Sequence, residues 1–217
     1  MILDAGCGIG GSAIWLAKKY GARVIGITLS DNQLRQAQQL AQQEQVADLT
    51  DFFIKDYLNT GFPDEAFDVV WAAESVCYAE SKIDFLKEAF RILKNGGRLI
   101  IADGFLKRET KNKEEERWFN VFIKGLALSN LAKIDEFGED LKKAGFKNMK
   151  YWDKTEAIKI SSKKLYLMCL FCLPFLKVIE WLRLTPKLLT DNGLAGLAQY
   201  NMVKEGLAGY GVFYAEK

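Results

Sequence analysis

The sequence contains no histidine and only four cysteines. Without histidine, the chain has no imidazole to serve as an acid, a base or a metal ligand. The cysteines show no paired framework of the kind that crosslinks small secreted domains. Cys169 and Cys172 form a C-x-x-C pair, but their neighbours are apolar and no second pair exists. We therefore expect two buried thiols here and no metal site.

A large excess of either charge is also missing. Thirty basic residues face 28 acidic ones, so the net charge is +2 and no global field attracts nucleic acid. The first residues show neither a basic leader nor a cleavable apolar segment. We expect a cytoplasmic protein, and 217 residues with 49% hydrophobic side chains suffice for a single domain spanning residues 1–217.

A short apolar run, Ile2 to Ala5, leads into a loop with glycine at positions 6, 8 and 10. Apolar residues then recur at helical spacing from Ser12 to Tyr20. Glycines let the backbone turn sharply and approach a ligand, and a helix N-terminus offers free N–H groups to a carboxylate. This strand, loop and helix predict a cofactor site, with a tight turn that binds nothing as the alternative.

Apolar strands continue to alternate with amphipathic helices along the chain, which predicts an α/β fold with an open, doubly wound parallel sheet. Ser30 is expected to cap the second helix. The later strands are predicted at Arg23 to Ile27, Asp51 to Ile54, Phe67 to Ala72, Arg98 to Ala102, Phe146 to Trp152 and Gly209 to Ala215, and the later helices at Asp31 to Gln45, Ile83 to Leu93 and Asp135 to Ala144.

Gly6, Gly8 and Gly11 also satisfy the G-x-G-x-x-G pattern of dinucleotide-binding proteins. A nicotinamide site would require an acid at the end of the second strand to hold a ribose diol. That strand ends Gly26-Ile27-Thr28-Leu29-Ser30 and carries no acid. The pattern therefore disfavours a nicotinamide oxidoreductase.

Four motifs occur in a characteristic order: Asp4 to Gly10, Gly26 to Ser30, Phe67 to Trp71 and Leu93 to Gly97. In order and spacing they resemble the class I S-adenosylmethionine-dependent methyltransferases, over residues 1 to about 105. The resemblance implies a Rossmann-like sheet of seven strands, mostly parallel, whose last strand is antiparallel. It also implies a cofactor-binding half at residues 1–105 and a substrate-side half at 106–217.

By this resemblance, S-adenosyl-L-methionine is the cofactor, and each part of it has expected neighbours. The glycine loop that begins at Asp4 would line the methionine part, the end of the second strand would surround the ribose, and Asp56 would accept a hydrogen bond from the adenine amino group. A turn or helix cap is the alternative role for Asp56. The expected cofactor residues are Asp4, Gly6, Gly8, Gly10, Thr28, Leu29, Gln33, Asp56 and Tyr57.

The stretch from Ala73 to Ala79 resembles the sterol, tocopherol and prenyl-diphosphate C-methyltransferases, and its Glu-Ser followed by Tyr is most like the geranyl diphosphate enzymes. Glu74 follows an apolar strand and should lie at the carboxyl edge of the sheet. There its charge would stabilise a carbocation on the acceptor, and Tyr78 would form a second wall. A salt bridge or cap for Glu74, and simple packing for Tyr78, are the alternatives.

A long segment at about residues 154–192 interrupts the second half before the last strand. Its centre, Leu165 to Leu176, is apolar but too short to span a bilayer. Residues 154–190 hold seven basic and two acidic side chains, an excess of five positive charges. A helical lid over a lipophilic substrate, a helix lying on an anionic membrane surface, and a core helix with snorkelling lysines all fit this pattern. Aromatic residues that could form a substrate cage are Trp118, Phe119, Phe122, Tyr200 and Tyr210.

Together these features predict methyl transfer from S-adenosylmethionine to a lipophilic small molecule, with C-methylation of an isoprenoid-type alkene as the leading reaction. An O- or N-methyltransferase acting on a small amphiphile is one alternative. A module that binds the cofactor without activity is the other.

Overall fold

The computed structural model describes all 217 residues, and the chain divides into two compact units. The first unit comprises residues 1–103, 135–152 and 212–217, and the second comprises 104–134 and 153–211. The first boundary lies beside the one predicted near residue 105. Residues 135–152 and 212–217, which were predicted in the second half, belong to the first unit instead. The single domain stays a prediction.

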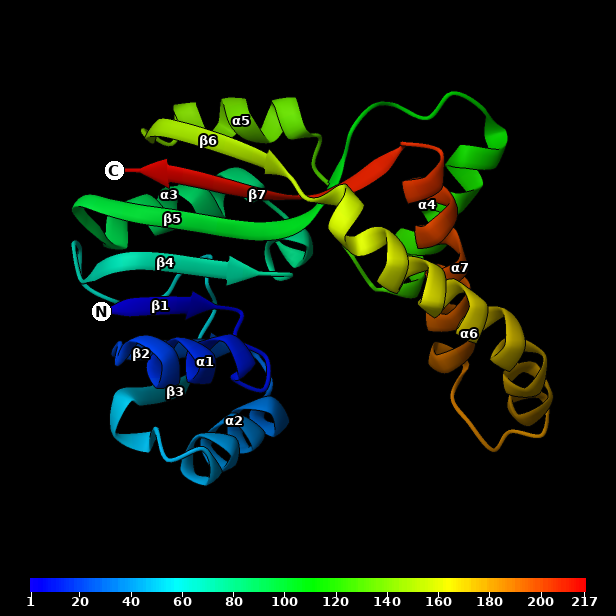
Figure 1. Ribbon diagram of the computed structural model, residues 1–217, viewed down its shortest axis with the longest axis horizontal. Helices are drawn as coiled ribbons and strands as arrows, with labels where there is room; N and C mark the ends of the chain where they lie inside the picture. Colours follow the sequence, from blue (N-terminus) through cyan, green and yellow to red (C-terminus); the bar gives the residue numbers. More distant parts are fainter. The chain divides into compact units, whose positions relative to one another are not determined.

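One seven-stranded sheet has the order β3-β2-β1-β4-β5-β7-β6. In this order, β3, β2, β1, β4 and β5 pair in parallel. Strand β7 runs antiparallel between β5 and β6 (Figure 1). The predicted Rossmann-like sheet with an antiparallel last strand is confirmed. The strands are Ile2–Ala5 (β1), Val24–Thr28 (β2), Thr50–Ile54 (β3), Phe67–Ala73 (β4), Leu93–Leu106 (β5), Lys147–Asp153 (β6) and Ala208–Glu216 (β7).

The helices of the cofactor side begin where the sequence predicts. The Ser30 hydroxyl accepts a hydrogen bond from the Gln33 backbone N–H at 3.3 Å and so caps α2, as expected. A short 3-10 turn, Val76–Tyr78 (η2), follows β4, and another, Ala47–Leu49 (η1), precedes β3. The α-helices are Gly11–Tyr20 (α1), Asp31–Gln43 (α2), Lys82–Ile92 (α3) and Ile134–Lys143 (α5).

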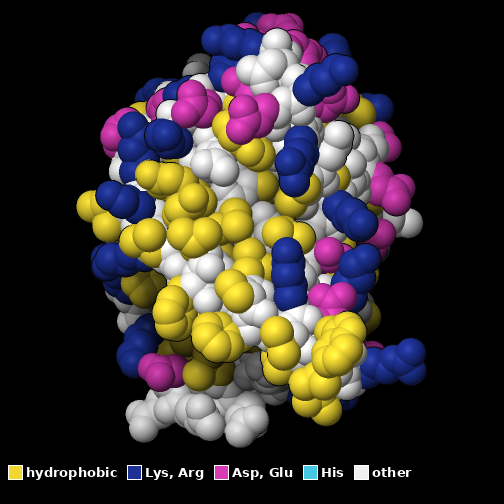
Figure 2. All heavy atoms as spheres, turned by 90° about the vertical axis from the view of Figure 1, so that its right-hand side faces the viewer, with side chains coloured by type: hydrophobic (Ala, Val, Ile, Leu, Met, Phe, Trp, Pro, Cys, Tyr) yellow, Lys and Arg dark blue, Asp and Glu magenta, His cyan; other side chains and the backbone are white.

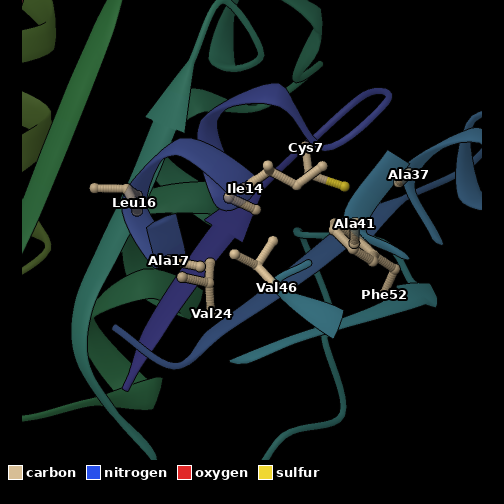
Figure 3. Packing of buried hydrophobic residues seen from close by; sticks show 10 residues of the cluster. Cys7, Ile14, Leu16, Ala17, Val24, Ala37, Ala41, Val46 and Phe52 are labelled. Carbon is tan, nitrogen blue, oxygen red and sulfur yellow. The ribbon is translucent and has the colours of Figure 1, made fainter. Parts of the chain in front are cut away.

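A hydrophobic cluster fixes the glycine loop to the helices that follow it (Figure 3). Ile14 and Ala17 of α1 pack with Ala37 and Ala41 of α2, and Phe52 of β3 joins them from the sheet. Burial of this apolar surface stabilises the first unit and holds the carboxyl ends of the strands rigidly. The edge of the sheet that carries the predicted site is therefore built on a packed core.

The second unit is mainly helical and contains Lys113–Gly125 (α4), Thr155–Trp181 (α6) and Lys187–Lys204 (α7). Helix α7 packs against both α4 and α6. The segment predicted at about residues 154–192 is helical, as expected, but α6 runs through Pro174 without ending. None of the helices combines the length and the apolar character needed to cross a bilayer.

The prediction of two buried thiols in α6 is right for one cysteine and wrong for the other. Cys169 is buried, whereas Cys172 is exposed. Three residues along an α-helix place the two side chains about 60° apart around the axis, so Cys172 lies at the edge of the buried side, where solvent reaches it. A Cβ added to Gly196 of α7 would lie only 2.8 Å from the Cys169 sulfur, which shows how closely the two helices approach at the buried thiol.

Candidate functional site

The glycine loop leaves β1 with three residues in left-handed backbone conformations. The φ angles are +81° at Gly6, +55° at Gly8 and +84° at Gly10. The Gly6 N–H donates a 3.0 Å hydrogen bond to the carbonyl of Ile27, which ties the loop to β2. The N-cap residue of α1 is Gly10, which has no side chain to accept from the first N–H groups of the helix. The Ala13 N–H donates to Asp4, so the N–H groups of Gly11 and Ser12 are those offered to a ligand. The loop thus forms a backbone cradle of the kind that binds carboxylates and phosphates.

Asp4 lies at the carboxyl end of β1, and its carboxylate is buried. Burial raises the pKa of Asp4 from 3.8 to about 7, although a hydrogen bond from the Ala13 backbone lowers the pKa in part. Its Oδ2 atom has no hydrogen-bond partner. A buried oxygen without a donor is costly, so a ligand that supplies a donor at this position would relieve it. This observation supports a bound cofactor.

At the end of β2 the side chains are arranged for hydroxyl recognition. The Thr28 hydroxyl donates to Oε1 of Gln33 at 2.7 Å, which fixes the orientation of the amide. This bond occupies the amide oxygen of Gln33 and leaves the amide nitrogen as its hydrogen-bond donor. Leu29 is 71% exposed and presents an apolar side chain beside it. The three residues predicted to surround the ribose therefore lie together.

Asp56 and Tyr57 follow β3, and both already have structural partners. Oδ1 of Asp56 accepts a 2.8 Å hydrogen bond from the Leu58 N–H, the turn role that was the alternative for this residue. The Tyr57 hydroxyl donates to the carbonyl of Ser75 at 3.1 Å, and its ring packs edge-on against Phe85. Burial raises the pKa of Tyr57 to about 12. Tyr57 therefore holds the loop after β4 in place through Ser75. Contacts of Asp56 and Tyr57 with adenine stay a prediction.

Glu74 is the first residue after β4 and has an unusual backbone. Its φ angle is +52°, a left-handed conformation that is strained for a residue with a side chain. Its N–H donates to the carbonyl of Ala102 at 2.8 Å, and its side chain is exposed. The pKa of Tyr78 is raised by burial and then by the charges of Cys77, Asp103 and Glu74. Glu74 and Tyr78 therefore interact electrostatically, and their roles in catalysis stay a prediction.

Ser75 joins the glycine loop to the loop after β4, a role that the sequence analysis missed. Its hydroxyl donates to the carbonyl of Ala5 at 2.6 Å, and its carbonyl accepts the Tyr57 hydroxyl. A Cβ placed on Gly6 would lie 2.5 Å from the Ser75 Cβ. Ser75 thus links the carboxyl ends of β1, β3 and β4, and only glycine fits opposite it.

Two buried charged residues, which the sequence analysis also missed, form hydrogen bonds to the backbone of residues 74–79. Oδ2 of Asp103, which follows Ala102 of β5, accepts the Cys77 N–H at 2.9 Å. The Lys82 ammonium donates to the carbonyls of Cys77 and Ala79 at 2.9 and 2.6 Å. Burial lowers the pKa of Lys82. Asp103 could have been found by the rule that located Glu74, because it also follows a predicted strand directly.

Because Gly6 lies close to Ser75 and Gly8 does not, alanine substitutions at these two glycines should differ in their effect on stability. Gly6→Ala should lower the free energy of unfolding by about 2–3 kcal/mol, because the new methyl group collides with Ser75 and the backbone is left-handed. Gly8→Ala meets nothing within 4 Å and should cost only about 1 kcal/mol of backbone strain. Urea unfolding of the two variants measures the difference. Equal losses would contradict the contact with Ser75.

The aromatic residues proposed as a substrate cage are distributed over several places in the second unit. Phe122 and Tyr210 line a small apolar cavity of about 50 Å³, together with Leu131, Ile158 and Met202. Tyr200 lines a separate groove between α6 and α7, beside Lys159 and Lys163. Trp118 and Phe119 are half-buried on α4. The five residues lie on α4, α7 and β7, and Phe122 and Tyr210 line a different cavity from Tyr200, so they do not form one cage.

Comparison with known proteins identifies the part of the chain that carries this site. Residues 3–101 match the family model described as a methyltransferase domain. The 2-methyl-6-phytyl-1,4-hydroquinone methyltransferase of Synechocystis sp. is 36% identical over 148 residues. Residues 3–101 are a methyltransferase domain. This domain contains every residue predicted to bind the cofactor or act in catalysis, and the predicted resemblance is confirmed.

The match covers 66% of this chain but only 45% of the Synechocystis protein, so the chain spans less than half of that relative's length. Among solved structures, geranyl diphosphate C-methyltransferase from Streptomyces coelicolor A3(2), in complex with Mg²⁺, geranyl diphosphate and S-adenosyl-L-homocysteine, has a TM-score of 0.76 at 23% identity, over 99% of this chain and 70% of that one. The [4+2]-cyclase SpnF has a TM-score of 0.75 at 25% identity, over 100% and 73%. The fold of the methyltransferase domain thus recurs in a protein named for a different reaction.

Proposed function

We propose that this protein transfers a methyl group from S-adenosylmethionine to a carbon atom of a lipophilic acceptor with an isoprenoid-type chain. The observation that carries the proposal is Glu74, an exposed carboxylate held in a strained backbone at the carboxyl edge of the sheet, on a loop bonded to the glycine loop. Strain of this kind persists where the surrounding structure imposes it, and it is concentrated at functional sites.

The residues of the first unit suit the cofactor. Oδ2 of Asp4 lacks a donor, and a cationic amino group of the cofactor would supply one. The N-terminus of α1 would bind the carboxylate of the methionine part. Gln33, oriented by Thr28, would donate to the ribose hydroxyls. Asp56 would accept from the adenine amino group through the carboxylate oxygen that does not bind Leu58.

When bound, the cofactor supplies an electrophilic methyl group on a sulfonium centre. The chain's own residues must then place the acceptor carbon in line with it and exclude water. If the π electrons of an alkene form the new carbon–carbon bond while the sulfur–carbon bond breaks, a cation is left on the acceptor. The Glu74 carboxylate would stabilise that cation and accept the proton that the acceptor then loses. Tyr78, which shares its electrostatic environment, would limit access of water.

A lipophilic acceptor agrees with the names of two similar proteins. The Synechocystis relative is named for a phytylated hydroquinone, and the Streptomyces neighbour for geranyl diphosphate. Both named substrates carry an isoprenoid chain attached to a polar group. These names therefore support an acceptor of this chemical class.

The reaction is tested by incubating the protein with methyl-labelled S-adenosylmethionine and a panel of prenyl diphosphates, sterols and phenolic lipids. We expect label on a carbon atom of at least one member. Transfer only to a hydroxyl or an amine would contradict C-methylation and favour an O- or N-methyltransferase acting on a small amphiphile.

A second candidate is a cofactor-binding module without methyl transfer. The cyclase that shares this fold at 25% identity is the observation in its favour. Calorimetry with S-adenosylhomocysteine separates the two candidates when it is combined with the labelling experiment. Binding without transfer to any acceptor favours the module, and absence of binding would overturn both.

A further inference from the structure

Helix α6 has two apolar faces, and only one of them is packed. Its buried residues, Thr155, Ser162, Cys169 and Leu173, recur at intervals of seven and four and lie on one side of the helix. This side of α6 faces the interior of the second unit, because α7 packs against α6. A surface helix of a globular protein normally carries polar residues on its other side. The other side of α6 departs from that pattern.

The solvent-facing side repeats the same spacing with exposed apolar residues. Ile160, Leu167, Phe171 and Val178 follow one another at intervals of seven, four and seven, and Phe171 is 74% exposed. Phe175 lies beside them and its ring contacts that of Phe171. Trp181, the last residue of α6, is 81% exposed. Leu182 and Leu184, which follow the helix, and Leu188 and Leu189, at the start of α7, are exposed as well. We call this surface of α6 and the residues that follow it, from Ile160 to Leu189, the outer face of α6.

Basic side chains border the outer face. Lys163, Lys164, Lys177, Arg183 and Lys187 are all exposed. The two acidic residues between positions 154 and 190 are Glu156, whose carboxylate is paired with Lys159, and Glu180. Figure 2 shows a face on which hydrophobic side chains gather, with lysine and arginine side chains among and around them. The outer face is therefore apolar in the middle and positively charged at its borders.

We propose that the outer face of α6 binds the surface of an anionic lipid bilayer, with the helix lying in the plane of the membrane. Helices that bind in this way combine Trp, Phe and Leu on the inserted side with Lys and Arg beside it. The long lysine side chains can extend to the headgroups while their methylene chains stay in apolar surroundings. Trp181, the last residue of α6, is the kind of residue that prefers the membrane–water interface.

The charge distribution favours a bilayer over a second copy of the chain. A symmetric dimer through the outer face would bring the same surface of both copies together. Lys163, Lys164 and Lys177 of one copy would then approach basic residues of the other, and like charges at an interface are unfavourable. Anionic headgroups complement these charges instead. The inference does not depend on which acceptor is methylated.

Vesicle binding, measured without cofactor or acceptor, tests the proposal separately from the proposed function. The full chain is mixed with vesicles of phosphatidylcholine alone or with phosphatidylglycerol added, and the bound fraction is measured by flotation. We expect at least about tenfold stronger binding to the anionic vesicles, reduced by high salt. Binding of Trp181 at the interface should shift its fluorescence to shorter wavelength, and Trp181→Phe should remove that shift. No binding, or equal binding to both vesicles, would overturn the proposal.

Matched variants distinguish the outer face from the rest of the surface. Phe171→Ser combined with Phe175→Ser should abolish vesicle binding, whereas Tyr20→Ser, which alters an exposed aromatic residue of α1, should leave it unchanged. Lys164→Glu should weaken binding to anionic vesicles, and Lys147→Glu on β6 should not. A dimer without vesicles that the double variant dissociates would assign the outer face to a second copy and overturn the proposal.

Discussion

Asp4→Asn should make the protein more stable at pH 8 and at the same time weaken its binding of the cofactor. The pKa of Asp4 is raised by burial from 3.8 to about 7. Stability contributed by a group with a raised pKa is fully present below the unfolded value and is lost as the pH rises through the folded value. As the pH rises from 3.8 to 7, the free energy of unfolding therefore falls by roughly 4 kcal/mol relative to a protein without this ionisable group. Asparagine removes that loss.

Urea unfolding between pH 4 and pH 9 measures the effect, because this range extends from near the unfolded pKa of 3.8 to above the folded pKa of about 7. The two proteins should be equally stable near pH 4, and the variant should be more stable by up to roughly 4 kcal/mol at pH 8. Asp51→Asn, at an exposed position on β3, should change stability by less than about 0.5 kcal/mol at either pH. A difference between wild type and variant that is independent of pH would contradict the buried carboxylate.

Cofactor affinity should move in the opposite direction. A charge-assisted hydrogen bond contributes about 1.5–3 kcal/mol, so the affinity of Asp4→Asn for S-adenosylhomocysteine should fall by about 10- to 100-fold. Calorimetry at pH 8 measures this directly. Unchanged affinity would show that Oδ2 of Asp4 receives no donor from the cofactor. Stability sacrificed at a binding site is a common exchange in enzymes.

The positions of the main site residues could be predicted because topology determines them. In a parallel sheet the carboxyl ends of the strands meet at one edge, so Asp4, Thr28 and Glu74 could be located from the ends of β1, β2 and β4. Ser30 was predicted as a cap from its place before an amphipathic helix, and the hydrogen bond to Gln33 confirms it. In each case a local pattern and the topology lead to the same position.

The contacts behind the site could not be predicted in this way. Ser75 bonds to Ala5, 70 residues earlier in the chain, and Asp103 of β5 bonds to Cys77 of η2. Lys82 is a basic residue at the start of a helix, where burial is unusual, and its role depends on the carbonyls that η2 leaves exposed to it. Such contacts depend on how the loops close in space, which strand order alone does not specify.

Helix α6 shows a different limit of sequence reasoning. Its apolar centre and basic flanks were compatible with a lid, a membrane-surface helix and a core helix. Periodicity does not separate these possibilities, because a helix that is apolar on both sides has no single apolar stripe. The structure assigns one side to the interior and leaves the side of Phe171 and Trp181 exposed. Pro174, which cannot donate a backbone hydrogen bond, does not end α6, although proline inside a predicted helix normally indicates its end.

Glu74→Gln should lower kcat by about 100-fold or more and leave cofactor affinity nearly unchanged. Glutamine keeps the size and hydrogen-bonding capacity of the side chain, but it carries no charge to stabilise a cation and cannot accept the proton. The loop stays in place, since Ser75, Asp103 and Lys82 hold it through other atoms. Turnover of the best acceptor and calorimetry with S-adenosylhomocysteine measure the two effects. Glu80→Gln, at an exposed position outside the loop contacts, should retain full activity.

Glu74→Gly separates a catalytic role from a structural one. Glycine adopts the φ angle of +52° without strain, so this variant should be about 1 kcal/mol more stable than the wild type in urea unfolding. It should be at least as inactive as Glu74→Gln, because the carboxylate is gone. A residue kept for folding would show the reverse, with lower stability in the glycine variant and normal turnover in the glutamine variant. Opposite effects on stability and turnover at one position are therefore what the strained carboxylate predicts.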